Sequence, residues 1–395
     1  MMTAELDDAA PPGIDPSTAS ADIDLAAFRA NIAALQDCVG STALMVVVKA
    51  DGYGHGIIHC AAEARRAGAG WLGVATPAEA LAVRAAGDTG PMLAWLYGAE
   101  EDLTPLVAAQ VDVSAQSLDQ ISRLTAAAAT AERQARVHLK VDTGLSRNGA
   151  PAADWPELCA AAAEAEDAGA IEVTAIWSHL AAADEPGHPS VPIQTAAFHR
   201  AYEVARAAGL EPALRHLGNS AAALVVPEAR LDLVRVGIAA YGIDPAPGIA
   251  ARAEVNLRPV MTLRSQLVNV KPIPAGAGVS YGWTWTAPRA TTVGLVPLGY
   301  GDGIPRHASN RASVGCSGRL APIRGRVCMD QFVVDLGEQA TAEPGDGVVV
   351  FGPGDHGEPT AADWADRCGT IGYEIVTRVG SRVPRRYLNA SPEVS

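Results

Sequence analysis

Lys49 stands between an apolar run and a glycine-rich turn. The run Leu44–Val48 is rich in β-branched residues, and residues 50–56 include three glycines, so the pattern predicts a buried strand over 44–49 that ends at a turn. Lysine is rarely buried unless it is paired or reacting. A lysine amine with a lowered pKa can form a Schiff base with a carbonyl cofactor. On this segment alone, a strand-end lysine that reaches solvent is an equal alternative.

Further polar side chains follow or interrupt other apolar strands. An arginine inside an apolar strand, such as Arg235, must be paired or bound, because an unpaired buried charge is costly. A lone histidine near a strand end more often packs through hydrogen bonds than acts in catalysis. The residues at such positions are Lys140, Asp142, Arg147, His179, Asn219, Ser220 and Arg235.

Strands and helices alternate through the first part of the chain, which indicates a parallel sheet. Eight such strands predict a closed (β/α)8 barrel of the TIM type, whose chemistry lies at the C-terminal ends of its strands. We expect this barrel over residues 20–254, after a flexible tail at 1–19. The predicted strands are 44–49, 71–76, 91–97, 111–115, 136–142, 171–180, 213–218 and 231–240.

From about residue 255 the pattern changes to short β-rich runs separated by turns such as Pro274-Ala275-Gly276. This predicts a mostly β C-terminal domain over 255–388, with one helix within 360–379. The start of the segment Asp22–Leu35 could add a strand near 21–25 to that domain.

Bulk composition excludes several classes of protein. With 49% hydrophobic and 19% charged residues among 395, the chain is an ordinary globular protein. A net charge of −14 argues against binding to nucleic acid or to a membrane surface. The six cysteines form no C-x-x-C pair, so we expect neither a disulfide framework nor a metal site, and a cytoplasmic location.

The loops after the seventh and eighth barrel strands form the recurrent phosphate site of this fold. Here they carry Ser220 ahead of a helical segment, and Gly237-Ile238. A hydroxyl, backbone N–H groups and a helix N-terminus can bind an anion. A lysine able to form an imine, opposite a phosphate site, fits pyridoxal 5′-phosphate.

The whole segment from about 21 to 388 resembles the alanine racemase family, whose members are fold-type III pyridoxal-phosphate enzymes. The stretch Val48–Gly56 is similar to that family's cofactor-attachment signature, which is highly specific. Further similar motifs follow in the family's order. They are Lys140–Gly144 with Arg147, Trp177–Ala181, Gly218–Ala221, Val234–Ile238, Val279–Gly282, Gly299–Gly303, Arg326–Gln331 and Tyr373-Glu374.

The resemblance implies racemisation of alanine by two bases, Lys49 and Tyr281, on opposite faces of the substrate. Lys49 would hold the cofactor, and Tyr281 would come from the other subunit of a homodimer. Arg235 would face the pyridine nitrogen, His179 would bridge Arg235 and Tyr281, and Lys140 would be a candidate for carbamylation. The cofactor phosphate would contact Tyr53, Ser220, Gly237, Ile238 and Tyr373; the substrate carboxylate would contact Arg147 and the Met329 backbone, with Tyr300 at the entrance.

Departures from the family pattern fall at Ser146, Asn148 and Gly372, close to these expected binding positions. They leave a serine or broad-specificity amino-acid racemase as an alternative to an alanine racemase that supplies peptidoglycan synthesis. A fold-type III decarboxylase is disfavoured because it would need a glutamate where Arg235 stands. A non-catalytic cofactor carrier would lack the β domain that carries Tyr281.

Overall fold

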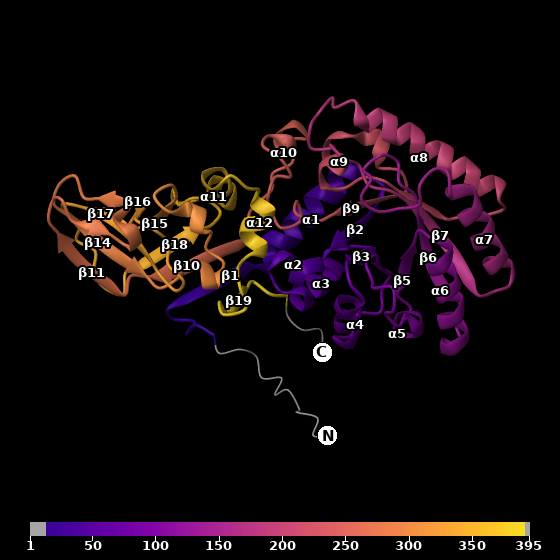
Figure 1. Cartoon of the computed structure of the whole chain (residues 1–395), viewed down its shortest axis with the longest axis horizontal. Helices are drawn as coiled ribbons and strands as arrows, with labels where there is room; N and C mark the ends of the chain where they lie inside the picture. The colour runs from indigo at the N-terminus through magenta and orange to yellow at the C-terminus, as the bar shows by residue number, and fades with distance from the viewer. Residues whose placement is uncertain (1–12, 392–395) are drawn as a thin grey trace, which may run out of the picture. The chain divides into compact units, whose positions relative to one another are not determined.

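The computed structural model describes residues 13–391, which form two compact units (Figure 1). One unit comprises Leu25–Arg258, and the other combines the described residues up to Asp24 with Pro259–Ala390. The first 12 residues of the expected tail lie outside the described residues. Within the described part of the chain, no helix combines the length and apolarity needed to cross a membrane.

The larger unit is a nearly closed barrel of eight parallel strands in the order β8-β7-β6-β5-β4-β3-β2-β9. Backbone hydrogen bonds from Asp232 to the Arg215 carbonyl (3.2 Å) and from Arg235 to the Gly218 carbonyl (3.0 Å) bring β9 against β8. The predicted fold class is therefore confirmed. The strands are β2 (Ala43–Val47), β3 (Trp71–Val74), β4 (Met92–Ala94), β5 (Asp112–Ala115), β6 (Ala135–Lys140), β7 (Ile171–Trp177), β8 (Leu214–His216) and β9 (Leu233–Val236).

Helices follow the strands, and they bury their apolar faces by packing against the sheet. In α1 (Leu25–Val39), for example, the buried residues Phe28, Ile32, Leu35 and Val39 recur at helical spacing. The others are α3 (Ile57–Arg66), α4 (Pro77–Ala85), α5 (Thr104–Ala108), α6 (Leu118–Ala131), α7 (Trp155–Asp167), α8 (Ser190–Ala207), α9 (Ser220–Val225), the 3-10 turn η1 (Pro227–Ala229) and α10 (Ile249–Arg252).

The smaller unit is built on a nine-stranded sheet in the order β11-β14-β17-β16-β15-β18-β10-β1-β19. The N-terminal strand β1 (Ala19–Asp24) pairs antiparallel with β10 (Met261–Gln266) and parallel with β19 (Arg385–Leu388). The remaining strands are β11 (Asn269–Ile273), β14 (Thr291–Val296), β15 (Ser313–Cys316), β16 (Arg319–Arg324), β17 (Phe332–Gly337) and β18 (Gly347–Phe351), with β12 (Gly278–Val279) and β13 (Trp285–Thr286) as a separate pair.

Two elements differ from the predicted ones. The segment expected to hold one helix holds two, α11 (Ala361–Cys368) and α12 (Gly372–Thr377), because Gly369 adopts a left-handed conformation (φ 69°) and ends the first. The strand predicted over 44–49 ends at Val47, and Lys49 opens the short element α2 (Lys49–Tyr53).

Candidate active site

The turn that begins at Lys49 is left-handed. Ala50, Asp51 and Gly52 have φ values of 52°, 52° and 60°, and Tyr53 also has a positive φ of 53°. Left-handed backbone costs roughly 1–2 kcal/mol for each residue other than glycine. Such strain persists only where the surrounding structure fixes it, and it concentrates at functional sites.

Glu79, which does not stand out in the sequence as a site residue, holds this turn in place. One carboxylate oxygen accepts the Ala50 N–H (2.6 Å), and the other accepts the N–H groups of Ala75 (2.8 Å) and Thr76 (3.1 Å). Thr76 and Glu79 form the capping box of α4. The sequence spacing could have revealed that helix cap, but not its bond to the turn after Lys49.

Lys49 lies among cationic side chains at the ends of the barrel strands. Its amine is 5.8 Å from the centre of the Trp95 ring. Burial lowers the pKa of Lys49, the charges of Arg147 and Arg235 lower it further, and Glu79 opposes this shift. The amine is therefore more easily deprotonated than an ordinary lysine, as a nucleophile requires.

Lys140 is buried at the end of β6, with its amine 4.1 Å from the centre of the Trp177 ring. Burial and the charges of Arg235, Arg147 and Lys49 lower its pKa to about 7, against the opposing effect of Asp142. The Asp142 carboxylate instead accepts the N–H groups of Gly144, Leu145 and Ser146, which shapes the loop that carries the exposed Arg147.

Arg235 is 5% exposed, and its guanidinium makes four hydrogen bonds. It donates to the carbonyls of Ser178 (2.9 Å) and Leu217 (3.2 Å) and to ring nitrogens of His179 (3.2 Å) and His216 (3.0 Å). Burial lowers the pKa of Arg235 to about 9. Burial, followed by the charge of Arg235, also lowers the pKa of His179 well below its usual value, so this imidazole is neutral and accepts at Nδ1.

Ser220, Gly237 and Tyr53 meet in one corner of the barrel, at the ends of β8 and β9. The Ser220 hydroxyl accepts the Gly237 N–H at 2.9 Å. A Cβ atom at Gly237 would collide with the Tyr53 hydroxyl, so only glycine allows this approach. Tyr53 packs against Tyr241, with ring centres 4.9 Å apart, and Ile238 is fully buried beside the corner.

The other predicted site residues lie in the smaller unit and are mainly exposed. Tyr281 is 72% exposed, Met329 54% and Tyr300 42%. Their loops are joined, because the Cys328 carbonyl accepts the Tyr300 N–H (3.0 Å) and the Ser280 hydroxyl donates to the Arg326 carbonyl (2.7 Å). Tyr373 is half-buried in α12. Trp283, which the sequence analysis did not select, is 73% exposed two residues after Tyr281.

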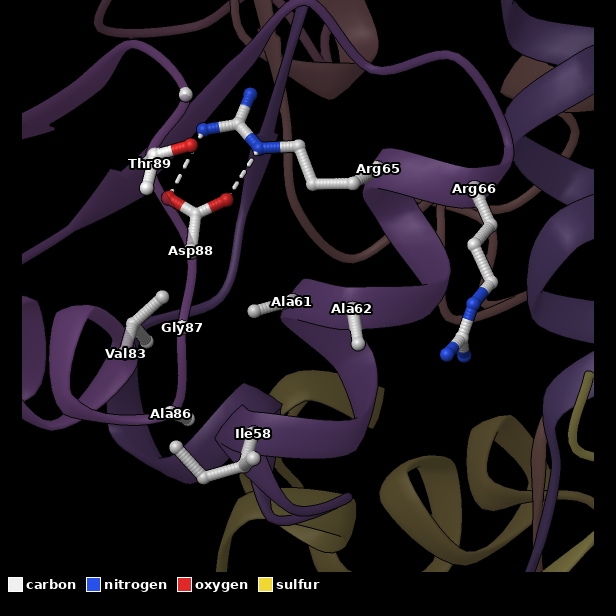
Figure 2. Close-up of a pocket in the computed structure, with 11 residues that line it drawn as sticks. Ile58, Ala61, Ala62, Arg65, Arg66, Val83, Ala86, Gly87, Asp88 and Thr89 are labelled. Atoms are coloured by element: carbon white, nitrogen blue, oxygen red, sulfur yellow. Dashed lines mark hydrogen bonds and ion pairs between the residues drawn. The ribbon is translucent and has the colours of Figure 1, made fainter. Parts of the chain in front are cut away.

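Two further observations concern parts of the structure outside the predicted site. In residues 13–391, no group of three or more His, Cys, Asp and Glu side chains could hold a metal ion. A pocket of about 440 Å³ between α3 and α4 is lined by alanines and by Arg65, which is paired with Asp88 (Figure 2). This pocket contains none of the predicted site residues.

Comparison with known proteins relates both units of the chain to one family. Residues 23–245 match the model "Alanine racemase, N-terminal domain", and residues 260–387 match "Alanine racemase, C-terminal domain". Alanine racemases of Frankia casuarinae and Thermobifida fusca are 55% and 54% identical, over 93% and 95% of this chain and 95% and 99% of theirs. The crystal structure of alanine racemase from Streptomyces lavendulae superposes with a TM-score of 0.93 at 49% identity, covering 95% of this chain and 98% of that one.

Proposed function

The chain belongs to the alanine racemase family of isomerases, and we propose that it interconverts L-alanine and D-alanine with pyridoxal 5′-phosphate as cofactor. The observation that carries the proposal is the cluster of Lys49, Lys140, Arg147 and Arg235. Besides burial, the charges of Arg147 and Arg235 lower the pKa of both lysines. Such a cluster needs anions to complete it. A cofactor phosphate and a substrate carboxylate would supply them.

The residues present fit this cofactor. Lys49 would hold the aldehyde, and the corner formed by Ser220, Gly237 and Tyr53 would bind the phosphate through hydroxyl and backbone N–H groups. Ile238 and Tyr373 would complete that phosphate site. Arg235 would face the pyridine nitrogen as a fixed donor, which disfavours protonation of that nitrogen.

When bound, pyridoxal phosphate withdraws electrons from an attached amino acid and thereby acidifies its Cα–H bond. Lys49 would take or return the proton on one face, and its lowered pKa makes the neutral amine available as a base. Tyr281 would act on the opposite face. Its exposed hydroxyl suits a residue that completes the site of a partner subunit in a homodimer.

Substrate recognition is assigned to Arg147 and to the Met329 backbone, which would bind the carboxylate. His179, which already accepts from Arg235, would also contact Tyr281, and Tyr300 would narrow the entrance. Lys140 has a pKa of about 7, so much of its amine is neutral near physiological pH. Because carbon dioxide reacts with neutral amines, we propose that Lys140 carries a carbamate, whose negative charge would pair with Arg147.

The alternative is a serine or broad-specificity racemase on the same scaffold. Ser146 and Asn148, which depart from the family pattern, flank Arg147, the residue proposed to bind the substrate carboxylate. This is the observation that favours the alternative. D-Alanine as the product would serve peptidoglycan synthesis. Cys38, Cys60, Cys159, Cys316, Cys328 and Cys368 are all free, which supports a cytoplasmic location.

A racemisation assay with L-alanine, L-serine and L-lysine tests the proposal. We expect kcat/KM to be highest for alanine. We also expect borohydride to link the cofactor covalently to Lys49. A higher kcat/KM for serine or lysine would overturn the choice of substrate, and label on another lysine would overturn the role of Lys49.

Shared sites can be tested by mixing two inactive variants, Lys49→Ala and Tyr281→Phe. If each site combines Lys49 of one subunit with Tyr281 of its partner, mixed dimers regain one intact site. Mixed dimers without activity would contradict the shared site. Each variant alone, taken through the same mixing procedure, is the control.

A further inference from the structure

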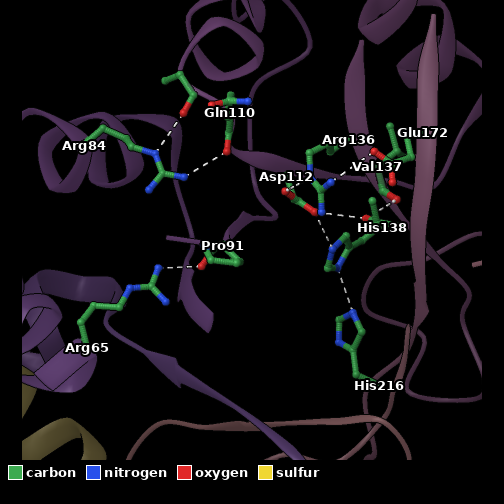
Figure 3. Close-up of polar contacts among 12 residues, drawn as sticks. Arg65, Arg84, Pro91, Gln110, Asp112, Arg136, Val137, His138, Glu172 and His216 are labelled. Carbon is green, nitrogen blue, oxygen red and sulfur yellow. Dashed lines mark hydrogen bonds and ion pairs between the residues drawn. The ribbon is translucent and has the colours of Figure 1, made fainter. Parts of the chain in front are cut away.

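A line of buried polar side chains leads from Arg235 through the interior of the barrel. Arg235 donates from Nη1 to His216 Nδ1 (3.0 Å). His216 Nε2 lies 2.9 Å from His138 Nδ1, and His138 Nε2 lies 3.1 Å from a carboxylate oxygen of Asp112, as Figure 3 shows. Arg235 is 5% exposed, Asp112 is 1% exposed, and both histidines are fully buried.

The two ends of this line fix every proton along it. A guanidinium can only donate, so His216 Nδ1 must be bare and its proton must lie on Nε2. That proton points at His138 Nδ1, which must therefore accept, so His138 also carries its proton on Nε2. The carboxylate of Asp112 accepts this last proton, and both rings are neutral.

The surroundings hold each ring and the carboxylate in place. The His216 ring stacks on Trp177 (ring centres 5.4 Å apart, 12° between planes), and His138 packs against Trp71 (5.4 Å). Asp112 also accepts from Arg136 (2.9 Å) and Thr174 (3.1 Å). Burial alone would raise the pKa of Asp112, but its bonds to His138 and Arg136 lower the pKa below its usual value, so it stays ionised.

The direct partners of Arg235 are two carbonyls and two neutral imidazoles, none of which carries a negative charge. A buried charge is stable only when it is compensated. We propose that Asp112 is a positioning residue for Arg235: it compensates the buried guanidinium through His138 and His216, and keeps one bare ring nitrogen facing Nη1. This inference rests on the proposed function only in that Arg235 is assigned to face the cofactor.

The protons can be observed by nitrogen NMR of the holoenzyme labelled with ¹⁵N-histidine. The chain has nine histidines, so single His→Gln variants can assign the signals. We expect His138 and His216 both to be protonated at Nε2 alone. A proton on Nδ1 of either ring would overturn the proposal.

The matched pair Asp112→Asn and Arg136→Gln tests the connection. Asp112 does not contact His216. If Asp112 affected only its direct neighbours, the His216 Nδ1 signal would be the same in Asp112→Asn as in wild type. We expect this signal to shift. Arg136→Gln keeps the carboxylate, and its His216 signal should stay at the wild-type position. An unmoved His216 signal in folded Asp112→Asn overturns the proposal.

In Asp112→Asn we also expect kcat for alanine to fall about tenfold, with KM changing less than about twofold, because the line does not reach the substrate carboxylate. If this variant does not fold, Thr174→Val weakens the same carboxylate more gently, and an unmoved His216 signal there contradicts the connection. If His138 and His216 are both protonated at Nε2 alone but the enzyme does not turn over alanine, the proposed function is refuted instead. Alanine turnover with a proton on Nδ1 would refute the positioning role alone.

Discussion

The barrel and the smaller unit present their candidate residues in opposite ways. In the barrel, Arg235 and Lys140 are buried, and each hydrogen bond of Arg235 has a fixed direction. In the smaller unit, Tyr281 is 72% exposed and begins a short 3-10 turn, η2 (Tyr281–Trp283). The barrel residues are thus preorganised by one chain, whereas Tyr281, which we propose completes the site of a partner subunit, is largely exposed.

This contrast predicts that barrel substitutions disturb cofactor, stability and activity together, while substitutions in the smaller unit affect activity alone. The line of polar side chains from Asp112 to Arg235 is the most buried part of the barrel site, since all of its members are buried. The exposed loops of Tyr281, Tyr300 and Met329 represent the opposite extreme. Four substitutions test how far the contrast extends.

Lys49→Ala should have the largest effect. It removes the amine proposed both to hold the cofactor and to act as a base, so we expect racemisation to fall by at least about 10⁴-fold. Cofactor absorbance after gel filtration should disappear as well. Retained absorbance with full activity would remove Lys49 from the mechanism.

Tyr281→Phe should come next and should separate activity from folding. Tyr281 is largely exposed, so melting temperature and cofactor absorbance should match wild type. Removal of the proton from one enantiomer should slow by roughly 10²–10⁴-fold, the usual contribution of general acid–base catalysis. Exchange of the Cα proton with deuterated water, measured separately for L- and D-alanine, gives both rates, and Trp283→Phe serves as an exposed aromatic control in the same turn.

The third substitution, Lys140→Met, tests how burial of Lys140 in the barrel makes stability depend on pH. Its pKa is about 7 in the folded barrel and about 10.4 when unfolded, so the unfolded chain binds more protons between these values. The cost of burying the charged amine is therefore fully present below about pH 7, and it disappears as pH rises toward 10. In bicarbonate-free buffer, Lys140→Met should be more stable than wild type at pH 6 by a few kcal/mol, and this advantage should shrink by pH 9. A difference between the two unfolding curves that does not vary with pH would contradict the lowered pKa.

The sequence allowed prediction of the barrel and of the strand-end residues, because strand periodicity and the cost of burying charge are local signals. Arg235 was expected to need partners, and it has four. The identities of those partners were not predictable: His216 and His138 sit inside strands where a histidine is usually a packing residue, and their pairing depends on which strands become neighbours. A turn after Lys49 was expected from its glycines, but its left-handed conformation was not, because Ala50 and Asp51 do not favour positive φ as glycine does.

Glu79→Ala should have the smallest effect. It tests whether the Glu79 side chain alone maintains the left-handed turn after Lys49. The variant loses three hydrogen bonds, including the one to the Ala50 N–H. We expect the free energy of unfolding to fall by about 2–3 kcal/mol, measured by denaturant titration. The control Thr76→Ala removes only the cap of α4 and should cost about 1 kcal/mol. Glu79→Ala should also slow cofactor reattachment to the apoenzyme, because the turn that begins at Lys49 is no longer anchored, whereas Thr76→Ala should not. Equal reattachment rates for the two variants would mean that the rest of the barrel, rather than Glu79, maintains the left-handed turn.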